Sequence, residues 1–141
     1  QIGEIARIVL AHGIEAVIAT NTTVTRPGLE HEPLANEAGG LSGRPLKARS
    51  TEVIRELYRH LQGRVSIIGV GGIENADDAW EKLVAGADAV QVYTAFIYQG
   101  PALVRRIVRG LEAKVRAAGV ATLAEAVAAA RAKPVSATPG R

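Results

Sequence analysis

The chain has 141 residues, of which 48% are hydrophobic and 22% charged, and its net charge at neutral pH is +3. These values are typical of a globular domain with a hydrophobic core. Because cysteine is absent, disulfide scaffolds, thiolate metal sites and cysteine catalysis are excluded for this segment, and no apolar run approaches the roughly 20 residues of a membrane-spanning helix.

Charged and aromatic residues give little support to nucleic-acid or metal binding. The basic residues are scattered or recur at helical spacing, as on a solvated helix face, and the few aromatic residues are not interleaved with them. The histidines, His12, His31 and His60, have no partner ligands at the spacing that a metal site needs. We therefore expect no nucleic-acid partner and no metal.

Apolar periodicity and turn residues predict five helices and three strands. A first helix stops before Gly13, and a continuous apolar strand over 16–20, buried on both faces, follows it. A long polar loop occupies 22–44, and Pro45 lies in the first turn of the second helix, which Gly63 ends. A strand over 66–70 follows, then a helix capped by Asn75 and ended by Gly86, and then a strand over 89–93. The last two elements are a helix between Pro101 and Gly119 and a final helix that opens with the capping box of Thr122 and Glu125.

This alternation of strands and helices indicates a parallel sheet of the α/β class. A (β/α)8 barrel typically needs about 250 residues and eight strands, so we expect the C-terminal part of such a barrel, with its last three strands. A small open α/β sheet is the alternative. The chain begins at Gln1 without methionine, with the apolar pattern already under way at Ile2. We therefore expect a piece of a longer protein, with barrel residues at 1–133 and a disordered tail at 134–141.

Two glycine-bearing stretches, 39–45 and 70–73, are candidates for anion binding. Main-chain N–H groups at glycine turns and helix starts attract anions, because no side chain blocks the approach and the helix dipole adds positive potential. The second stretch follows a predicted strand, and the next strand ends at Tyr93 and Thr94. Neighbouring turns of this kind predict one phosphate held between them, although a Gly-Gly pair can also serve only a tight strand-to-helix passage.

A run of short polar residues, Thr20 to Thr23, follows the first predicted strand. Active sites of (β/α)8 barrels lie at the carboxyl ends of the strands. Neutral amides and hydroxyls there can bind an uncharged heterocycle or a carboxylate edge. The alternative interpretation is an Asx or Thr turn that only caps the strand end.

Several of these segments together resemble dihydroorotate dehydrogenase, in the family's order and spacing, from Ile2 to about Leu111. The segments are VIATNTT, GGLSGRPL, STEVIREL, IIGVGGI and GADAVQVYTAFIYQGP. The SGRPL form and the Tyr93-Thr94 ending are similar to class 2, the quinone-dependent branch. The resemblance implies an FMN-containing barrel that oxidises dihydroorotate to orotate in pyrimidine biosynthesis. The alternatives are a class 1 dihydroorotate dehydrogenase and a phosphate-binding barrel half without redox chemistry.

The resemblance also assigns expected roles to residues. Thr20 would contact the flavin, and Asn21 and Thr22 would hydrogen-bond the orotate ring and its carboxylate region. The FMN phosphate would be held by main-chain groups of four residues that follow the strands: Gly43, Gly72, Tyr93 and Thr94.

Other parts of the family's site have no counterpart here. The class 2 base is a serine on an earlier loop, and Ser42, Ser50 and Ser66 do not match its motif. A flavin-contacting lysine and the N-terminal helices that dock to the membrane and admit quinone would also lie upstream. The resemblance thus implies a peripheral membrane enzyme, on the cytoplasmic face if bacterial, of which this piece alone is inactive. The oligomeric state is left open.

Overall fold

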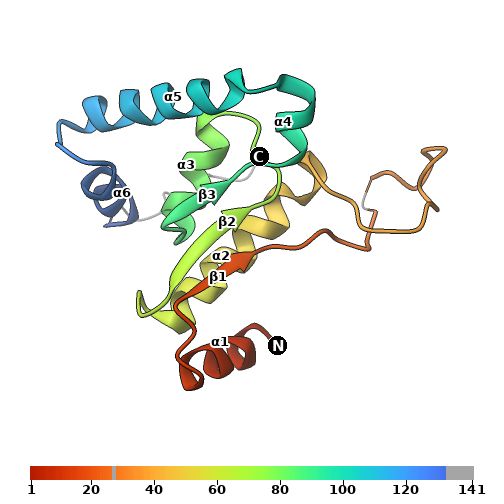
Figure 1. Cartoon of the computed structure of the whole chain (residues 1–141), viewed down its shortest axis with the longest axis horizontal. Helices are drawn as coiled ribbons and strands as arrows, with labels where there is room; N and C mark the ends of the chain where they lie inside the picture. Colours follow the sequence, from red (N-terminus) through yellow and green to blue (C-terminus); the bar gives the residue numbers. More distant parts are fainter. Residues whose placement is uncertain (27, 133–141) are drawn as a thin grey trace, which may run out of the picture.

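The computed structural model describes residues 1–26 and 28–132, which form an α/β arrangement around a three-stranded sheet (Figure 1). The strands are β1 (Ala16–Ala19), β2 (Ser66–Val70) and β3 (Ala89–Gln91). The helices are α1 (Ile2–Ala11), α2 (Lys47–Leu61), α3 (Ala76–Ala85), α4 (Thr94–Gln99), α5 (Ala102–Ala118) and α6 (Leu123–Ala132), and a 3-10 turn, Arg44–Leu46, precedes α2. None of the helices in the described ranges is long and apolar enough to cross a membrane.

The strands lie parallel in the order β1-β2-β3, so β2 is central and the other two are at the sheet edges. Val17 pairs with Ile67, and Gly69 pairs with Val90. Because side chains alternate along a strand, these residues share one face of the sheet, while Ile18 and its partner Ile68 point to the other. Because the strands are parallel, their three carboxyl ends meet at one edge of the sheet, as in a βαβ arrangement.

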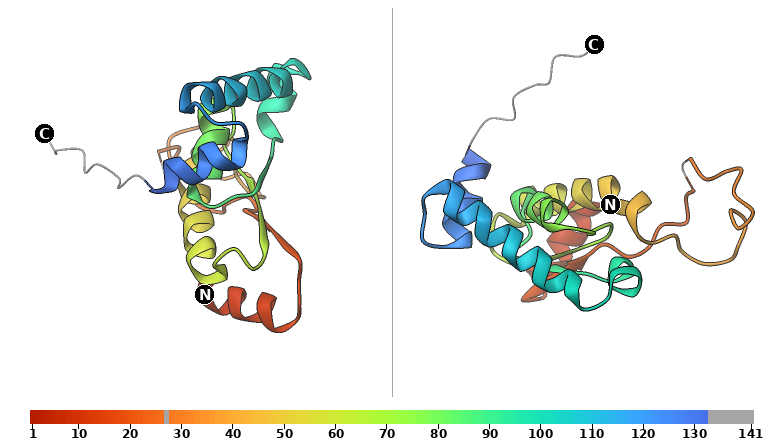
Figure 2. Two further views of the ribbon diagram at one scale, coloured as in Figure 1. Left: turned by 90° about the vertical axis from the view of Figure 1, so that its left-hand side faces the viewer. Right: turned by 90° about the horizontal axis from the view of Figure 1, so that it is seen from above.

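Helices cover one face of this sheet (Figure 2). One core cluster joins α1 and α2 to β2 through Val9, Ile54, Leu57 and Ile67. A second cluster joins α3, α4 and α5. The Asn75 side chain caps α3 by accepting the N–H groups of Asp77 and Asp78.

The other face of the sheet is bare, which corrects the expectation that the first strand is buried on both faces. Ile18 is 64% exposed, and Ile68 and Val70 are only half-buried. The apolar run predicts burial from composition alone, but no helix of the described residues packs on this face. A sheet face of this kind matches the interior of a barrel whose other strands are absent.

Two strand ends and one short helix differ from the sequence predictions. β1 ends at Ala19 and β3 at Gln91, so Thr20, Val92 and Tyr93 lie outside the strands. The six-residue helix α4 was not predicted, because it is too short to show a helical period. Along α5, Leu103 and Ile107 are buried, whereas Val104 and Val108 are exposed. The predicted tail at 134–141 lies outside the described residues.

The loop between β1 and α2 projects from the end of the sheet as an extended arm (Figures 1 and 2). A two-residue antiparallel bridge between Thr23 and Leu41 closes its base. The Arg26 guanidinium donates to the main-chain oxygens of Glu37 and Gly39, at 3.3 and 2.7 Å. The two ends of the loop are thereby held together beside the carboxyl ends of the strands.

Candidate functional site

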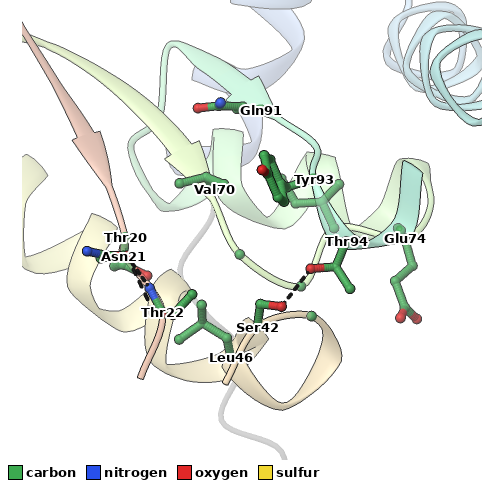
Figure 3. Close-up of a pocket in the computed structure, with 15 residues that line it drawn as sticks. Thr20, Asn21, Thr22, Ser42, Leu46, Val70, Glu74, Gln91, Tyr93 and Thr94 are labelled. Carbon is green, nitrogen blue, oxygen red and sulfur yellow. Dashed lines mark hydrogen bonds between the residues drawn. The ribbon is translucent and has the colours of Figure 1, made fainter. Parts of the chain in front are cut away.

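A cavity of about 360 Å³ lies at the carboxyl ends of the three strands. Its walls come from the segments that follow β1, β2 and β3 and from the start of the 3-10 turn (Figure 3). All seven residues that the sequence singles out line this one cavity: Thr20, Asn21, Thr22, Gly43, Gly72, Tyr93 and Thr94. The fold thus brings together side chains that are more than 70 positions apart in the sequence.

Main-chain N–H groups on the glycine side of the cavity lack main-chain acceptors in the part of the chain that the structure describes. Gly43 has φ +81° and Gly72 has φ +68°, conformations that favour glycine. Among the described residues, the N–H groups of Gly43, Gly72 and Thr94 donate no hydrogen bond to other main-chain atoms. Thr94 begins α4, so the helix start adds positive potential at this wall. These groups make a surface suited to an anion.

A side-chain hydrogen bond joins two of the cavity walls. The Thr94 hydroxyl donates to the Ser42 hydroxyl at 2.9 Å, and Figure 3 shows the two side chains pointing toward one another from different segments. Gly43 packs beside this bond, since a Cβ added to it would lie 3.2 Å from Thr94 Cγ2. The glycine loop after β1 and the turn after β3 are therefore held at a fixed distance.

In the polar run after β1, the Asn21 side chain is hydrogen-bonded within the described part of the chain and the Thr20 side chain is not. Asn21 Oδ1 accepts the N–H of Thr22 at 2.8 Å, so the amide nitrogen of Asn21 is the part available to a ligand. The buried hydroxyl of Thr20 has no hydrogen-bond partner among the described residues. Because a buried polar atom normally has a partner, this hydroxyl marks a position where a ligand atom is expected.

Charge at the rim of the cavity is paired within the chain. Arg44 and Glu74 form an ion pair at 2.8 Å, and this contact raises the pKa of the exposed Arg44 guanidinium. Figure 3 shows the Glu74 carboxylate pointing away from the other labelled side chains. The structure thus places Arg44 at the solvent side with Glu74.

Behind the glycine turn lies a polar cluster that the sequence analysis missed. Ser50, fully buried on α2, donates to the Val70 carbonyl oxygen at 2.5 Å. Asp78 on α3 accepts the Glu74 N–H at 2.9 Å and pairs with the Lys47 ammonium at 2.5 Å. The contact with Asp78 raises the pKa of Lys47.

Lys82 on α3 completes this cluster and has no solvent exposure. Its ammonium donates to the Lys47 carbonyl oxygen at 2.7 Å and to the Thr51 hydroxyl at 2.6 Å. Burial lowers the pKa of Lys82 to about 8, because removal from water disfavours the charged form. Its place on the stripe with Ala79 and Leu83 is the one signal in the sequence that could have indicated it.

Histidines play no part in this geometry. His12, His31 and His60 are exposed, and His60 contacts Glu56 at 3.1 Å, one turn earlier on α2. Within residues 1–26 and 28–132, no three His, Cys, Asp or Glu side chains are grouped as a metal site would require.

Comparison with known proteins shows which family the chain resembles. Residues 1–115 match the family model described as dihydroorotate dehydrogenase. The chain is 52% identical over 132 residues to a Streptomyces griseus protein named dihydroorotate dehydrogenase (quinone), covering 92% of this chain and 36% of that protein. A Synechococcus elongatus protein of the same name is 50% identical over 137 residues, with the same coverage.

Solved structures give the same result. A crystal structure of DHODH from Eimeria tenella in complex with ferulenol superposes with a TM-score of 0.83 at 42% identity, covering 89% of this chain and 34% of that one. The chain thus spans about a third of the length of the relatives that it matches. The predicted fold class is confirmed: the three parallel strands and their helices are part of a (β/α)8 barrel.

Proposed function

The chain belongs to the dihydroorotate dehydrogenase family, and we propose that it supplies part of the active site of a quinone-dependent dihydroorotate dehydrogenase, which oxidises dihydroorotate to orotate in pyrimidine biosynthesis. The observation that carries this proposal is that the seven expected site residues line one cavity. The quinone-dependent branch is favoured because the relatives from Streptomyces griseus and Synechococcus elongatus carry the quinone name.

The residues of the cavity fit a phosphorylated flavin. The N–H groups of Gly43, Gly72 and Thr94 have no main-chain acceptor among the described residues, as anion-binding groups should. The buried, unpartnered hydroxyl of Thr20 offers a hydrogen bond to an uncharged polar group. We therefore assign the phosphate of FMN to the main chain at Gly43, Gly72, Tyr93 and Thr94, and the flavin ring to Thr20.

When bound, FMN supplies the redox chemistry of the reaction by accepting a hydride equivalent from the substrate. The chain's own contribution is positioning. Asn21 is held by its bond to the Thr22 N–H, so its amide nitrogen can donate to a carbonyl or carboxylate oxygen of dihydroorotate. The Thr22 hydroxyl lies beside it and contributes a second polar group to the substrate side.

We further propose that the remaining parts of the reaction come from the portion of the relatives that this chain does not span. That portion would hold the serine base, the flavin-contacting lysine and the helices that admit quinone. A peripheral attachment to the membrane, on the cytoplasmic face in a bacterium, would follow from those helices.

The test is a full-length protein that carries this chain. We expect it to purify with flavin absorbance, to be bleached by dihydroorotate under anaerobic conditions, and to recover its absorbance when a soluble quinone is added. Bound flavin that dihydroorotate leaves oxidised would contradict the substrate assignment. Recovery with fumarate but not with quinone would place the protein in class 1 instead.

Asn21 separates this proposal from a barrel that binds only a phosphorylated ligand. Asn21→Ala should raise the KM for dihydroorotate or lower kcat by about tenfold or more, since a substrate hydrogen bond is lost. Flavin content should stay unchanged, because Asn21 is not assigned to the cofactor. A variant that kept full activity would argue against the substrate role.

A further inference from the structure

The polar cluster behind the glycine turn links α2 and α3 at the place where both approach the cavity. Lys82 reaches from α3 to the first turn of α2, where its ammonium contacts the Lys47 carbonyl oxygen and the Thr51 hydroxyl. The Thr51 hydroxyl in turn donates to the same carbonyl oxygen at 3.0 Å. The three groups close a small hydrogen-bonded ring, which we call the α2–α3 clamp (Lys82, Thr51 and the Lys47 carbonyl).

A fully buried lysine is uncommon and needs hydrogen-bond partners to be tolerated. The partners of Lys82 are not carboxylates but two neutral oxygens of one helical turn. Its contacts therefore fix the position of that turn rather than neutralise a charge.

The first turn of α2, which the clamp holds, packs against the glycine turn at Gly72. A Cβ added to Gly72 would lie 2.7 Å from Lys47 Cα and 2.8 Å from Lys47 N. The nearest atom to this position is Lys47 Cβ, at 2.5 Å, so Gly72 packs directly on Lys47 and a displacement of Lys47 is transmitted to Gly72. One turn further on, Ser50 holds the Val70 carbonyl oxygen at 2.5 Å, just before Gly71.

From these contacts we infer that Lys82 is a positioning residue for the phosphate of the cofactor, which it never touches. It holds the start of α2 against Gly72 and so keeps the Gly72 main chain in place at the wall of the cavity. The inference rests on the proposed function, because it takes the ligand of the glycine turn to be the FMN phosphate.

The test compares FMN with riboflavin, which has the same ring system without the phosphate. In a full-length protein that carries this chain, both are titrated into the apoprotein of the wild type and of Lys82→Met. The methionine keeps an unbranched apolar stem as far as Cε but loses the ammonium. We expect FMN affinity to fall about tenfold with riboflavin affinity nearly unchanged, because only the phosphate contacts depend on the clamp.

A purely structural role of Lys82 would give a different result. If Lys82→Met weakened FMN and riboflavin by the same factor, or left both unchanged, the positioning role would be wrong. The outcome is also distinguishable from a failure of the proposed function, because then the wild type itself would show no preference for FMN over riboflavin.

Two further variants keep the test decisive if Lys82→Met does not fold. Thr51→Val removes one partner of the ammonium at nearly constant shape, and it should reduce the preference for FMN in the same direction, by a smaller factor. An unchanged preference in Thr51→Val would overturn the inference. Lys114→Met is the matched control: Lys114 pairs with Asp77 away from the cavity, so its removal should leave the preference at the wild-type value.

Discussion

At the level of single residues, Thr20 distinguishes binding from folding most sharply. Its buried hydroxyl lacks a partner among the described residues, and such a group costs the free protein stability. We expect Thr20→Val to raise the free energy of unfolding of the apoprotein by about 1 kcal/mol while it lowers FMN affinity severalfold, because the hydroxyl is satisfied only by the flavin. Denaturant unfolding and flavin titration measure the two effects.

Thr23→Val serves as the control for this change. The Thr23 hydroxyl contacts the Thr25 hydroxyl at 2.9 Å and lies outside the cavity. Its loss should leave FMN affinity unaltered. If Thr20→Val destabilised the apoprotein and kept full FMN affinity, the assignment of Thr20 to the flavin would fail.

Gly43 provides a second prediction at this scale. Its φ of +81° and ψ of −152° lie in a region that is nearly restricted to glycine, and an added Cβ would contact Thr94 Cγ2 at 3.2 Å. Gly43→Ala should therefore displace the Ser42–Thr94 contact and lower FMN affinity about tenfold, at a cost in stability of about 1 to 3 kcal/mol. Flavin titration and thermal unfolding of the same samples give both values.

Gly63→Ala is the matched control, because Gly63 also has a positive φ, of +74°, but has open space around its Cβ position. It should lose stability without losing FMN. Gly72→Val would be less selective, since its Cβ would collide with the main chain of Lys47 and disturb α2 as well as the cavity. Equal FMN affinities for Gly43→Ala and Gly63→Ala would count against the anion-binding role of Gly43.

At the level of elements, the stability that Lys82 gives to the contact between α2 and α3 should depend on pH. The pKa of Lys82 is lowered to about 8 in the folded protein, from 10.5. Below pH 8 the lysine is charged in both folded and unfolded states, whereas between the two pKa values the unfolded chain binds the extra proton. Stability should therefore rise across this window, by up to about 3 kcal/mol.

The measurement is the free energy of unfolding of wild type and Lys82→Met between pH 7 and 10.5. The difference between the two proteins isolates Lys82 from other titrating groups. Lys47 should not confuse it, because its pKa is raised and its ion pair persists through the window. A difference that stayed constant with pH would mean that Lys82 is not titrating from a buried position.

The elements also show which structural features a sequence can predict. Helices α2, α3 and α5 have long apolar periods bounded by caps and glycines, so the sequence predicted them with small boundary errors. Helix α4 has six residues and is defined mainly by Gly100 and Pro101 behind it, so periodicity could not reveal it. The buried Lys82 was not predicted, because a lysine's partners in a core are set by tertiary packing and not by spacing.

The same distinction holds for the site. The glycine turns and the polar run of residues 20–22 carry local signals, and the resemblance to a known family added the individual residues, all seven of which line the cavity. The bond between Ser42 and Thr94 joins positions 52 residues apart, and no local pattern reports it.

At the level of the whole molecule, the described residues line the cavity with the segments at the carboxyl ends of the three strands and with the 3-10 turn. We expect residues 1–141 purified alone to bind FMN weakly and to oxidise no dihydroorotate, because the assigned base and lysine belong to segments that they do not include. Flavin titration and a dye-reduction assay on the purified chain check this. Turnover by the chain alone would show that its own residues include the base.

The bare face of the sheet gives the last prediction. Ile18 is 64% exposed in this chain, whereas the interior of a complete barrel is filled by packed side chains. Ile18→Ser should therefore have different effects in the chain alone and in a full-length protein that carries it. In the chain alone it should reduce self-association, measured by sedimentation, at little cost in stability.

In a full-length protein that carries the chain, Ile18→Ser should lower the free energy of unfolding by about 2 to 4 kcal/mol, since a buried side chain is truncated and a hydroxyl is buried. A loss below about 0.5 kcal/mol in the full-length protein would mean that this face stays in contact with solvent, and the assignment of the sheet to a closed barrel would then be wrong.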